Sequence, residues 1–407
     1  PLAAGELARH PAGAAGCARL PGVCARLDRV ERMTVGVLFY SDAPEIGGAE
    51  HSLATLLRHL DDRFRAHLVT TDAEVGEFLA AARPDSSRRT VRQVAGKLDL
   101  GPIREHVRSF RAIRPKLVHV NLRWIWTGQY GILAGLLSPR ARTIAVEHAQ
   151  PTATGSRVQR QLRSRLEARV DAHVAVGERT ARMIESYVGL PAGTVRTIHN
   201  GIEPFEPGPP ADVDRPFTIG AVGRLVPEKG FEDLPPALAR VPGARIVLVG
   251  EGPERERLAK LAREAGVEDR FELVGWQDSP REWLPKFDVL AAPSRLEGSP
   301  PLVALEAMMG GLPVVAADVG SVSEAVVDGE SGILVPPGNV AALADALTKL
   351  GTDREKRIEL GARGRRLALE EFTAARMAER FEALYEEMLS RGRRSIVPRR
   401  AHLAVLA

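Results

Sequence analysis

The stretch that most constrains the fold is 293–318, which reads PSRLEGSPPLVALEAMMGGLPVVAAD. A turn at 297–301 opens an apolar run, a pair of glycines closes it, and 313–317 has the composition of a fully buried strand. The pattern therefore predicts a helix over 302–309 between a loop and a strand. The first turn of a helix presents free N–H groups and roughly half a positive charge, which suits a phosphate.

One carboxylate, Glu306, lies on a face of this helix that we expect to be buried. A buried carboxylate without a partner costs several kcal/mol, so Glu306 must meet a hydrogen-bond donor. Two interpretations remain open at this point. The carboxylate is either a structural group tied to a backbone N–H or an arginine, or it accepts hydroxyl groups of a ligand.

The bulk properties favour a soluble protein with two domains. A chain of 407 residues exceeds what one hydrophobic core usually organises. No apolar run reaches the roughly 18 residues of a membrane-spanning helix. The net charge of +4 gives no indication of a nucleic-acid partner. Both cysteines, Cys17 and Cys24, lie in the first stretch, which excludes a disulfide framework and a Cys-based metal site for the main body.

Residues 1–32 read as a disordered leader. They are rich in Ala, Gly, Pro and Arg and lack the apolar core of a signal peptide. Because the first expected strand follows Met33 directly, we expect that methionine to be the natural start. With no targeting signal, the expected location is the cytoplasm, at its inner membrane face if the protein associates with a membrane.

Strands and helices alternate through 33–203, the expected N-terminal domain. The expected strands are 34–40, 66–71, 116–120, 143–148, 172–176 and 195–198, with helices near 50–60, 102–113 and 124–137 and a surface connection over 83–99. Such alternation predicts an α/β fold with a parallel sheet covered on both faces. Ligands of these sheets bind at the carboxyl ends of the strands. Gly47 and Gly48 follow the first strand, and His148 ends a later one, although a tight turn and a surface histidine remain alternatives.

A strongly basic helix is expected over 157–169, with arginines at 157, 160, 163, 165 and 169. Its arginines form either a solvated face or a patch for an acidic acceptor or an anionic membrane. The Pro-, Gly- and Asp-rich segment 204–216 reads as a linker between domains. Residues 217–372 form the second expected domain. A helix over 373–390 carries an apolar stripe that is expected to pack back on the N-terminal domain, and 391–407 reads as a loose basic tail.

Polar and glycine residues gather at strand ends of the second half. Arg224 and Lys229 share one loop, and two cations there suit a diphosphate. Glycine turns at 250–253 and at Gly275-Trp276 let a base or a sugar approach the backbone. With Glu306 suited to vicinal hydroxyls, a nucleotide diphosphate is the ligand class that satisfies all of these features.

The ordered set GRLVPEKG, GEGP, VGW, SRLEGSP and LEAMMGGLPVVA, with GGAE, VEHAQP and IHNGI in the first half, resembles the retaining glycosyltransferases of family GT4. The resemblance covers roughly 34–390. It implies the GT-B fold, in which two Rossmann-like domains with parallel sheets face each other across a cleft. It also implies transfer of a sugar from a nucleotide donor with retention, no resident cofactor and no metal. The absence of a suitable Asp-X-Asp loop agrees.

The resemblance also implies roles for individual residues. Arg224 and Lys229 would hold the donor diphosphate, Glu297 would address the transferred sugar, and His148 would lie beside the reacting centre. The donor-binding set is Gly47, Gly48, Gly223, Gly250, Gly252, Gly275, Trp276, Gly298, Ser299, Leu302 and Glu306. The candidates on the acceptor side are Glu147, Arg123 and Asn200.

One departure concerns the paired glutamates. Eight residues, 298–305, separate Glu297 from Glu306, one more than is usual in the family. The Pro300-Pro301 pair could absorb the extra residue, or Glu297 could be displaced and the sugar contact left to backbone amides.

Three functions stay open. They are a glycosyltransferase, a nucleotide-sugar epimerase of similar fold, and a non-catalytic subunit that binds a nucleotide sugar. A dehydrogenase is disfavoured because 250–252 lacks the third glycine of the dinucleotide fingerprint. Closure of the domains is expected, with hinges near 203–216 and at the entry into the last helix. The sequence specifies neither the sugar nor the base, and the acceptor is a small molecule, a lipid or a glycan.

Overall fold

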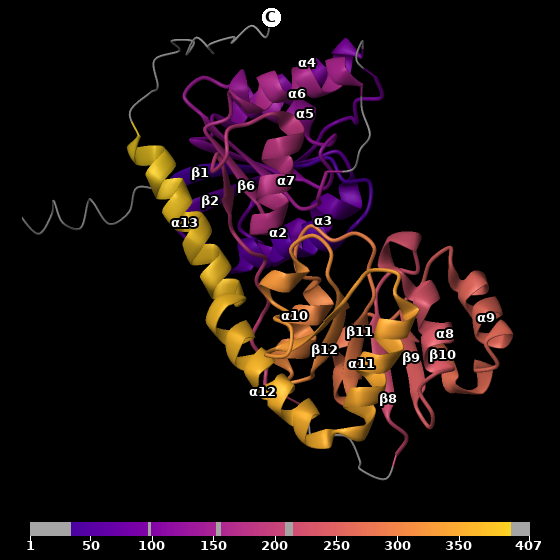
Figure 1. The fold of residues 1–407 in the computed structure, drawn as a ribbon. Coiled ribbons are helices and arrows are strands. Elements are labelled where there is room, and N and C mark those ends of the chain that lie inside the picture. Colours follow the sequence, from indigo (N-terminus) through magenta and orange to yellow (C-terminus); the bar gives the residue numbers. More distant parts are fainter. Residues whose placement is uncertain (1–33, 97–98, 152–155, 208–214, 392–407) are drawn as a thin grey trace, which may run out of the picture.

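The computed structural model describes residues 34–96, 99–151, 156–207 and 215–391. The predictions for the leader, for most of the tail and for the middle of the linker lie outside these residues. Two parallel sheets stand one above the other, each flanked by helices (Figure 1). The structure thus confirms the predicted α/β class with two Rossmann-like domains.

The N-terminal domain contains a seven-stranded sheet in the order β3-β2-β1-β4-β5-β6-β7. Every neighbouring pair is parallel, and β1 and β4 at its centre are buried on both faces, as expected for a sheet between two helical layers. The strands are β1 (Val35–Ser41), β2 (Phe64–Thr70), β3 (Ser87–Thr90), β4 (Leu117–Leu122), β5 (Arg142–Glu147), β6 (Ala172–Ala175) and β7 (Val195–Thr197). The helices are α2 (Gly48–His59), α3 (Ala73–Ala82), α4 (Leu100–Ile113), α5 (Gln129–Leu136), α6 (Arg157–Glu167) and α7 (Glu178–Val188).

The C-terminal domain contains a six-stranded parallel sheet in the order β10-β9-β8-β11-β12-β13. Its strands are β8 (Thr218–Val222), β9 (Arg245–Val249), β10 (Phe271–Gly275), β11 (Val289–Ala292), β12 (Val314–Ala317) and β13 (Gly332–Val335). The helices are α8 (Leu234–Leu238), α9 (Arg255–Glu264), α10 (Leu302–Met309), α11 (Val340–Thr352) and α12 (Arg354–Glu371). Helix α10 and strand β12 are the helix and the buried strand that the central stretch predicts.

The last helix, α13 (Ala374–Ser390), belongs structurally to the N-terminal domain. Its buried stripe, including Phe381 and Tyr385, joins the core beneath β1 and α2, and the Tyr385 hydroxyl lies 2.7 Å from His119 Nδ1. In Figure 1 the helices α12 and α13 run together along one side of both domains. The chain therefore crosses between the domains twice. The two crossing segments are joined by backbone hydrogen bonds. The Ile202 N–H donates to Phe372 O at 2.9 Å, and the Ala374 N–H donates to Ile202 O at 2.8 Å.

Several elements differ from the sequence predictions, and three of them show the reasons. The connection 83–99 contains the edge strand β3, whose four exposed residues show no alternation that would reveal it. Helix α5 begins at Gln129 rather than at Trp124, because Gly128 has φ 66° and its N–H donates to Asp42 Oδ2 at 2.7 Å. Helix α12 was missed, because few of its residues are buried and two of those are glycines.

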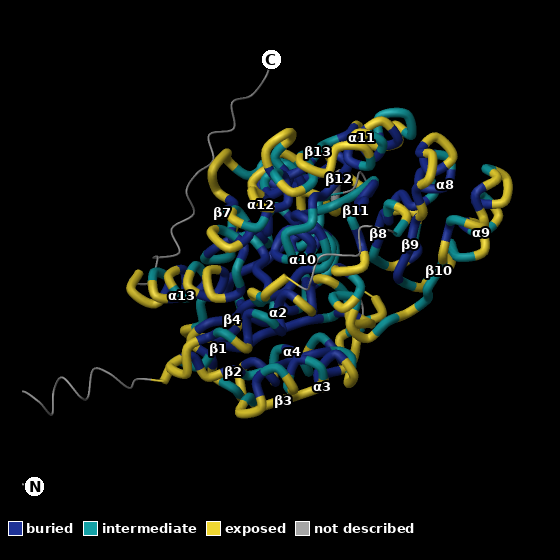
Figure 2. Tube along the Cα trace, turned by 90° about the horizontal axis from the view of Figure 1, so that it is seen from below, coloured by how far each residue is buried: buried dark blue, intermediate teal, exposed yellow. Residues whose placement is uncertain are grey.

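Burial follows the layers of each domain. The strands are mostly buried, whereas the outer faces of the helices and the loop tips are exposed (Figure 2). Within the described ranges, no helix combines the length and the apolar character that crossing a membrane requires.

Candidate active site

The loop before α10 meets the N-terminal domain. Gly298 lies against the main chain of His148 and Ala149 so closely that a side chain at position 298 would clash with it. The Thr180 hydroxyl donates to Gly298 O at 2.6 Å, and Asn200 Nδ2 donates to Ser299 Oγ at 3.1 Å. The loop that the sequence singles out is therefore held by both domains.

Lys229 is paired with the first of the two glutamates. It ends a one-turn 3-10 segment, Pro227–Lys229, after β8, and its Nζ lies 2.6 Å from Glu297 Oε1. The Ser294 hydroxyl donates to the same oxygen at 2.7 Å. The extra residue between the glutamates thus leaves Glu297 beside the cation that the sequence predicts for a diphosphate.

Arg224 takes part in a bridge between the domains. Its Nη1 lies 3.0 Å from Glu45 Oε1, and Nη2 of Arg123 donates to the same oxygen at 2.6 Å. The hydrogen bond from Arg123 lowers the pKa of Glu45 and so keeps it ionised. Arg123 and Arg224 come from opposite domains, so an anionic ligand entering here would exchange with the Glu45 carboxylate.

The second glutamate, Glu306, is paired with an arginine. Arg281 Nη2 lies 3.2 Å from Glu306 Oε1, and the Arg281 guanidinium stacks 4.4 Å from the centre of the Phe205 ring. Burial raises the pKa of Glu306, and the charge of Arg281 opposes that rise. The structure thus supplies the donor that a buried carboxylate requires, while 23% of the Glu306 side chain remains exposed.

The glycine turns after β8, β9 and β10 pack against one another. Gly250 has φ 146°, and a side chain there would clash with the carbonyl of Gly223. The Gly250 N–H donates to Gly275 O at 2.9 Å. Gly252 likewise lies against Leu225. The side chain of Trp276 is 68% exposed beside this surface, so a planar ligand group can reach it.

His148 lies at the carboxyl end of β5, beside Gly298. Its Nε2 lies 2.7 Å from Asn121 Oδ1, whereas its Nδ1 is buried and has no hydrogen-bond partner among the residues that the structure describes. Burial lowers the pKa of His148 to about 4, so the ring is neutral at pH 7. Gly47 precedes α2 in the same domain, where its N–H donates to Glu50 Oε2 at 3.2 Å, and Gly48 faces open space.

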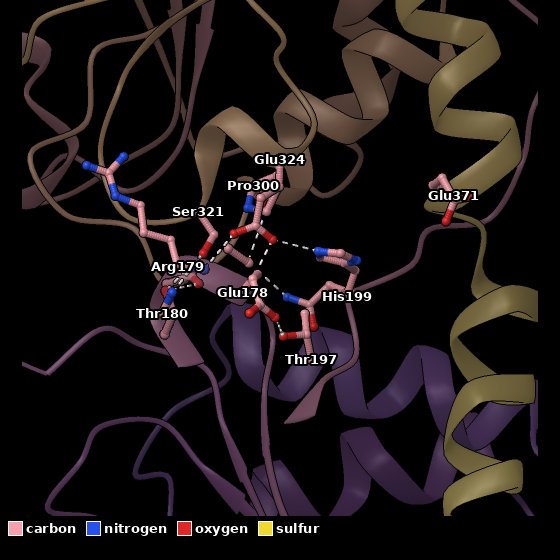
Figure 3. A network of polar contacts seen from close by, with 12 residues as sticks. Glu178, Arg179, Thr180, Thr197, His199, Pro300, Ser321, Glu324 and Glu371 are labelled. Atoms are coloured by element: carbon pink, nitrogen blue, oxygen red, sulfur yellow. Dashed lines mark hydrogen bonds and ion pairs between the residues drawn. The ribbon is translucent and has the colours of Figure 1, made fainter. Parts of the chain in front are cut away.

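The C-terminal domain caps helix α7 of the other domain (Figure 3). Gly177 precedes α7 and offers no capping side chain. The Glu324 carboxylate accepts from the backbone N–H groups of Glu178 and Arg179, both at 2.9 Å, and lies 2.7 Å from His199 Nε2. Burial alone would raise the pKa of Glu324, but these hydrogen bonds lower it to about 2.

Comparison with known proteins identifies the family. The family model described as Glycosyltransferase Family 4 matches residues 46–204, and the one described as Glycosyl transferases group 1 matches residues 205–367. The chain is 31% identical over 358 residues to a GDP-mannose-dependent alpha-(1-6)-phosphatidylinositol monomannoside mannosyltransferase of Mycobacterium tuberculosis, covering 79% of this chain and 90% of that relative. The chain belongs to the group 1 glycosyltransferases.

A second relative and a solved structure are consistent with this family. The chain is 30% identical over 271 residues to a 2-deoxystreptamine glucosyltransferase of Streptomyces kanamyceticus, covering 60% of this chain and 68% of the relative. The crystal structure of Anabaena HepE in complex with UDP superposes with a TM-score of 0.76 at 22% identity, covering 87% of this chain and all of the other. At that identity the likeness supports the GT-B fold alone.

The structure corrects the prediction for Glu147 in this glycosyltransferase. Its side chain is fully buried inside the N-terminal domain, where Arg163 Nη2 lies 2.8 Å from its Oε1. Arg163 also pairs with Glu167, and His173 lies beside both carboxylates. Glu147 is thus closed to an acceptor, and Arg163 does not belong to the solvated or membrane-facing side of the basic helix. A buried carboxylate needs such a partner, and the sequence does not show which arginine supplies it.

In the described part of the chain, one group of potential metal ligands has donor atoms close enough together to hold an ion. It consists of Glu147, Glu167 and His173. The guanidinium of Arg163 already supplies a positive charge to both carboxylates there. The arrangement therefore serves as a buried ionic network that ties α6 to β5 and β6.

The sequence prediction missed the residues that join the domains, namely Glu45, Thr180, His199, Ser321 and Glu324. The sequence contains one indication that groups such as Ser321 and Glu324 are needed. Gly177 stands where a helix start normally has Ser, Thr, Asp or Asn, so its first N–H groups needed partners from elsewhere.

Proposed function

We propose that this glycosyltransferase transfers a sugar from a nucleotide-diphosphate donor to a lipid or glycan acceptor, with retention at the anomeric carbon and without a bound metal. The single observation that carries the proposal is the pairing of Lys229 with Glu297 in the loop before α10, where the next residue, Gly298, lies against His148 of the other domain. The relatives support a nucleotide-sugar donor, since one is GDP-mannose-dependent and HepE was crystallised with UDP-glucose.

The donor diphosphate would bind between Arg224 and Lys229. It would take the places that the carboxylates of Glu45 and Glu297 hold beside these two cations. Charged hydrogen bonds of this kind stabilise the negative charge that develops on a departing diphosphate. Two cations and the start of α10 supply this stabilisation, which supports the proposal of catalysis without a metal.

The rest of the donor would extend along the C-terminal domain. Glu306 would accept the ribose hydroxyls, and the base would lie near Gly275 and the exposed ring of Trp276. The transferred sugar would then face the loop Glu297–Ser299 and the neutral ring of His148. This placement puts the reacting carbon at the junction of the domains, and it supports departure of the diphosphate and attack of the acceptor on the same face of the sugar.

The acceptor would bind to the N-terminal domain near Arg123, whereas the acceptor-side prediction for Asn200 is not supported, because its buried side chain is bonded to Ser52 and Ser299. The exposed arginines of and just beyond α6, Arg160, Arg165 and Arg169, would bring a lipid acceptor within reach by contact with an anionic membrane surface. The mycobacterial relative is named as a phosphatidylinositol monomannoside mannosyltransferase, which supports a lipid as one of the two acceptor classes.

A thermal-unfolding screen tests the donor proposal. A ligand that binds only the native state raises the free energy of unfolding by RT ln(1 + [L]/Kd), and the unfolding temperature rises with it. UDP, GDP, UDP-glucose and GDP-mannose are the probes, and at least one nucleotide with its sugar is expected to protect. No protection by any nucleotide sugar would refute the assignment.

The chemistry is tested by incubating the protective donor with and without lipid or glycan acceptors in the presence of EDTA. We expect an α-linked product from an α-linked donor at an undiminished rate. Conversion of the donor to another sugar without acceptor would indicate the epimerase, and tight binding without any turnover would indicate the non-catalytic subunit.

A further inference from the structure

One buried hydroxyl of the N-terminal domain contacts the loop before α10. Thr180 is completely buried in the first turn of α7. Its Oγ1 donates to Gly298 O at 2.6 Å and accepts from Ser321 Oγ at 3.2 Å, while its backbone N–H donates to Ser321 Oγ at 3.1 Å. Figure 3 shows Thr180 and Ser321 facing each other across the junction. All polar groups of this contact are thus paired, and the pairing joins the two domains.

The backbone around Thr180 is shaped for this contact. A side chain at Gly177 would clash with Ser321 and would lie 3.2 Å from Gly298 O. A side chain at Gly298 would clash with the carbonyl of His148. The absence of side chains at both positions therefore lets the start of α7, the loop and the end of β5 approach one another.

A peptide unit is planar, and its C=O and N–H point in opposite directions. When Thr180 fixes the carbonyl of Gly298, it also fixes the direction of the Ser299 N–H, which belongs to the same peptide unit. The Ser299 hydroxyl is held independently by Asn200 Nδ2, which is also a group of the N-terminal domain. The Gly298 carbonyl and the Ser299 hydroxyl thus have partners that are present only while the domains are together, whereas Glu297 is held within its own domain.

We infer that Thr180 is a positioning residue for the transferred sugar: through the Gly298 carbonyl it orients the loop Glu297–Ser299 against His148 when the domains close. The inference rests on the proposed function, in which this loop contacts the sugar of the donor. Thr180 itself touches neither donor nor acceptor. Its effect should therefore fall on the sugar and spare the nucleotide.

The test compares Thr180→Val, which keeps the shape and removes the hydroxyl, with Thr180→Ser, which restores it. Thr348→Val is the matched control, because Thr348 also donates to a backbone carbonyl, that of Ala344, but within α11. Affinities are measured by calorimetry for UDP with UDP-glucose and for GDP with GDP-mannose. Thr180→Val should bind the nucleotide as the wild type does and the nucleotide sugar about 3- to 10-fold more weakly, as expected for one lost hydrogen bond. Thr180→Ser and Thr348→Val should match the wild type.

Ser321→Ala provides a second variant in case Thr180→Val does not fold. It removes the hydroxyl that donates to Thr180 Oγ1 and should cause a smaller loss, again only for the nucleotide sugar. Equal losses for nucleotide and nucleotide sugar, or no loss for either, would overturn the positioning role while leaving the proposed function intact. A wild type that binds no nucleotide sugar would instead refute the proposed function.

Discussion

Replacing Glu324 with glutamine would weaken the contact that holds the two domains together. The Glu324 side chain is 18% exposed and accepts the backbone N–H groups of Glu178 and Arg179 at 2.9 Å, with His199 Nε2 at 2.7 Å. Glutamine has almost the same size and still offers one oxygen. It carries no charge, however, and a negative charge is what the start of α7 favours.

The pKa gives the size of the effect. Glu324 titrates at about 2 in the closed protein and would titrate near its ordinary 4.5 once the domains separate. That difference corresponds to about 3.4 kcal/mol in favour of the closed form, or about 300-fold in the ratio of closed to open protein. Because the pKa is lowered, this contribution is complete above pH 4.5 and is lost as the pH falls toward 2. At pH 7 the substitution should remove most of it.

Small-angle scattering and donor affinity at pH 7 measure the result. Glu324→Gln should have a larger radius of gyration than the wild type and should bind its nucleotide sugar more weakly, whereas the circular dichroism spectrum of the full chain should be unchanged. Glu330→Gln is the control, since Glu330 is exposed in the same domain. If Glu324→Gln scatters and binds like this control, Glu324 does not hold the domains together and the reasoning from its pKa is refuted.

Two further substitutions test the donor site. Lys229→Met should weaken nucleotide binding about 10- to 100-fold, because a charged hydrogen bond contributes roughly 1.5–3 kcal/mol. Lys260→Met, which changes an exposed lysine on α9, should leave nucleotide binding unchanged. Equal affinities of the two variants, measured by calorimetry, would contradict the diphosphate assignment. In Arg281→Met the loss of nucleotide affinity on acidification should occur at a higher pH than in the wild type. The reason is that burial raises the pKa of Glu306 and Arg281 opposes that rise. Affinity that requires ionised Glu306 exists above its pKa and is lost as the pH falls through it, so superimposable titrations of variant and wild type would rule out this role.

The sequence predicted the architecture well where local pattern determines structure. Strand β12 is a short apolar run that is buried on both faces, and α10 lies between a turn and a pair of glycines. Such elements follow from composition and periodicity alone. Strand β3 was not predictable in this way, because it is exposed, polar and recognisable only by its pairing with β2.

The candidate site was predictable within each domain but not across the boundary. Lys229 and Glu297 lie on neighbouring loops of one sheet, and the structure brings them together. Glu45 and Thr180, by contrast, meet their partners in the other domain, and that meeting depends on how two separately folded units are oriented. Glu147 shows the same limit inside one domain, since a position at a strand end does not reveal whether a side chain points to solvent or into the core.

The irregular spacing of Glu297 and Glu306 has a physical explanation in their separate anchors. Glu306 belongs to α10, whereas Glu297 is held by Lys229 and by Ser294 outside that helix. Between them, Pro301 has φ −55° and ψ 137°, which is an extended conformation, so the helix cannot start earlier. An added residue must then lengthen the loop rather than rotate the helix. The other domain holds that loop at Gly298. The number of residues between Glu297 and Glu306 can therefore change by one without moving either side chain from its partner.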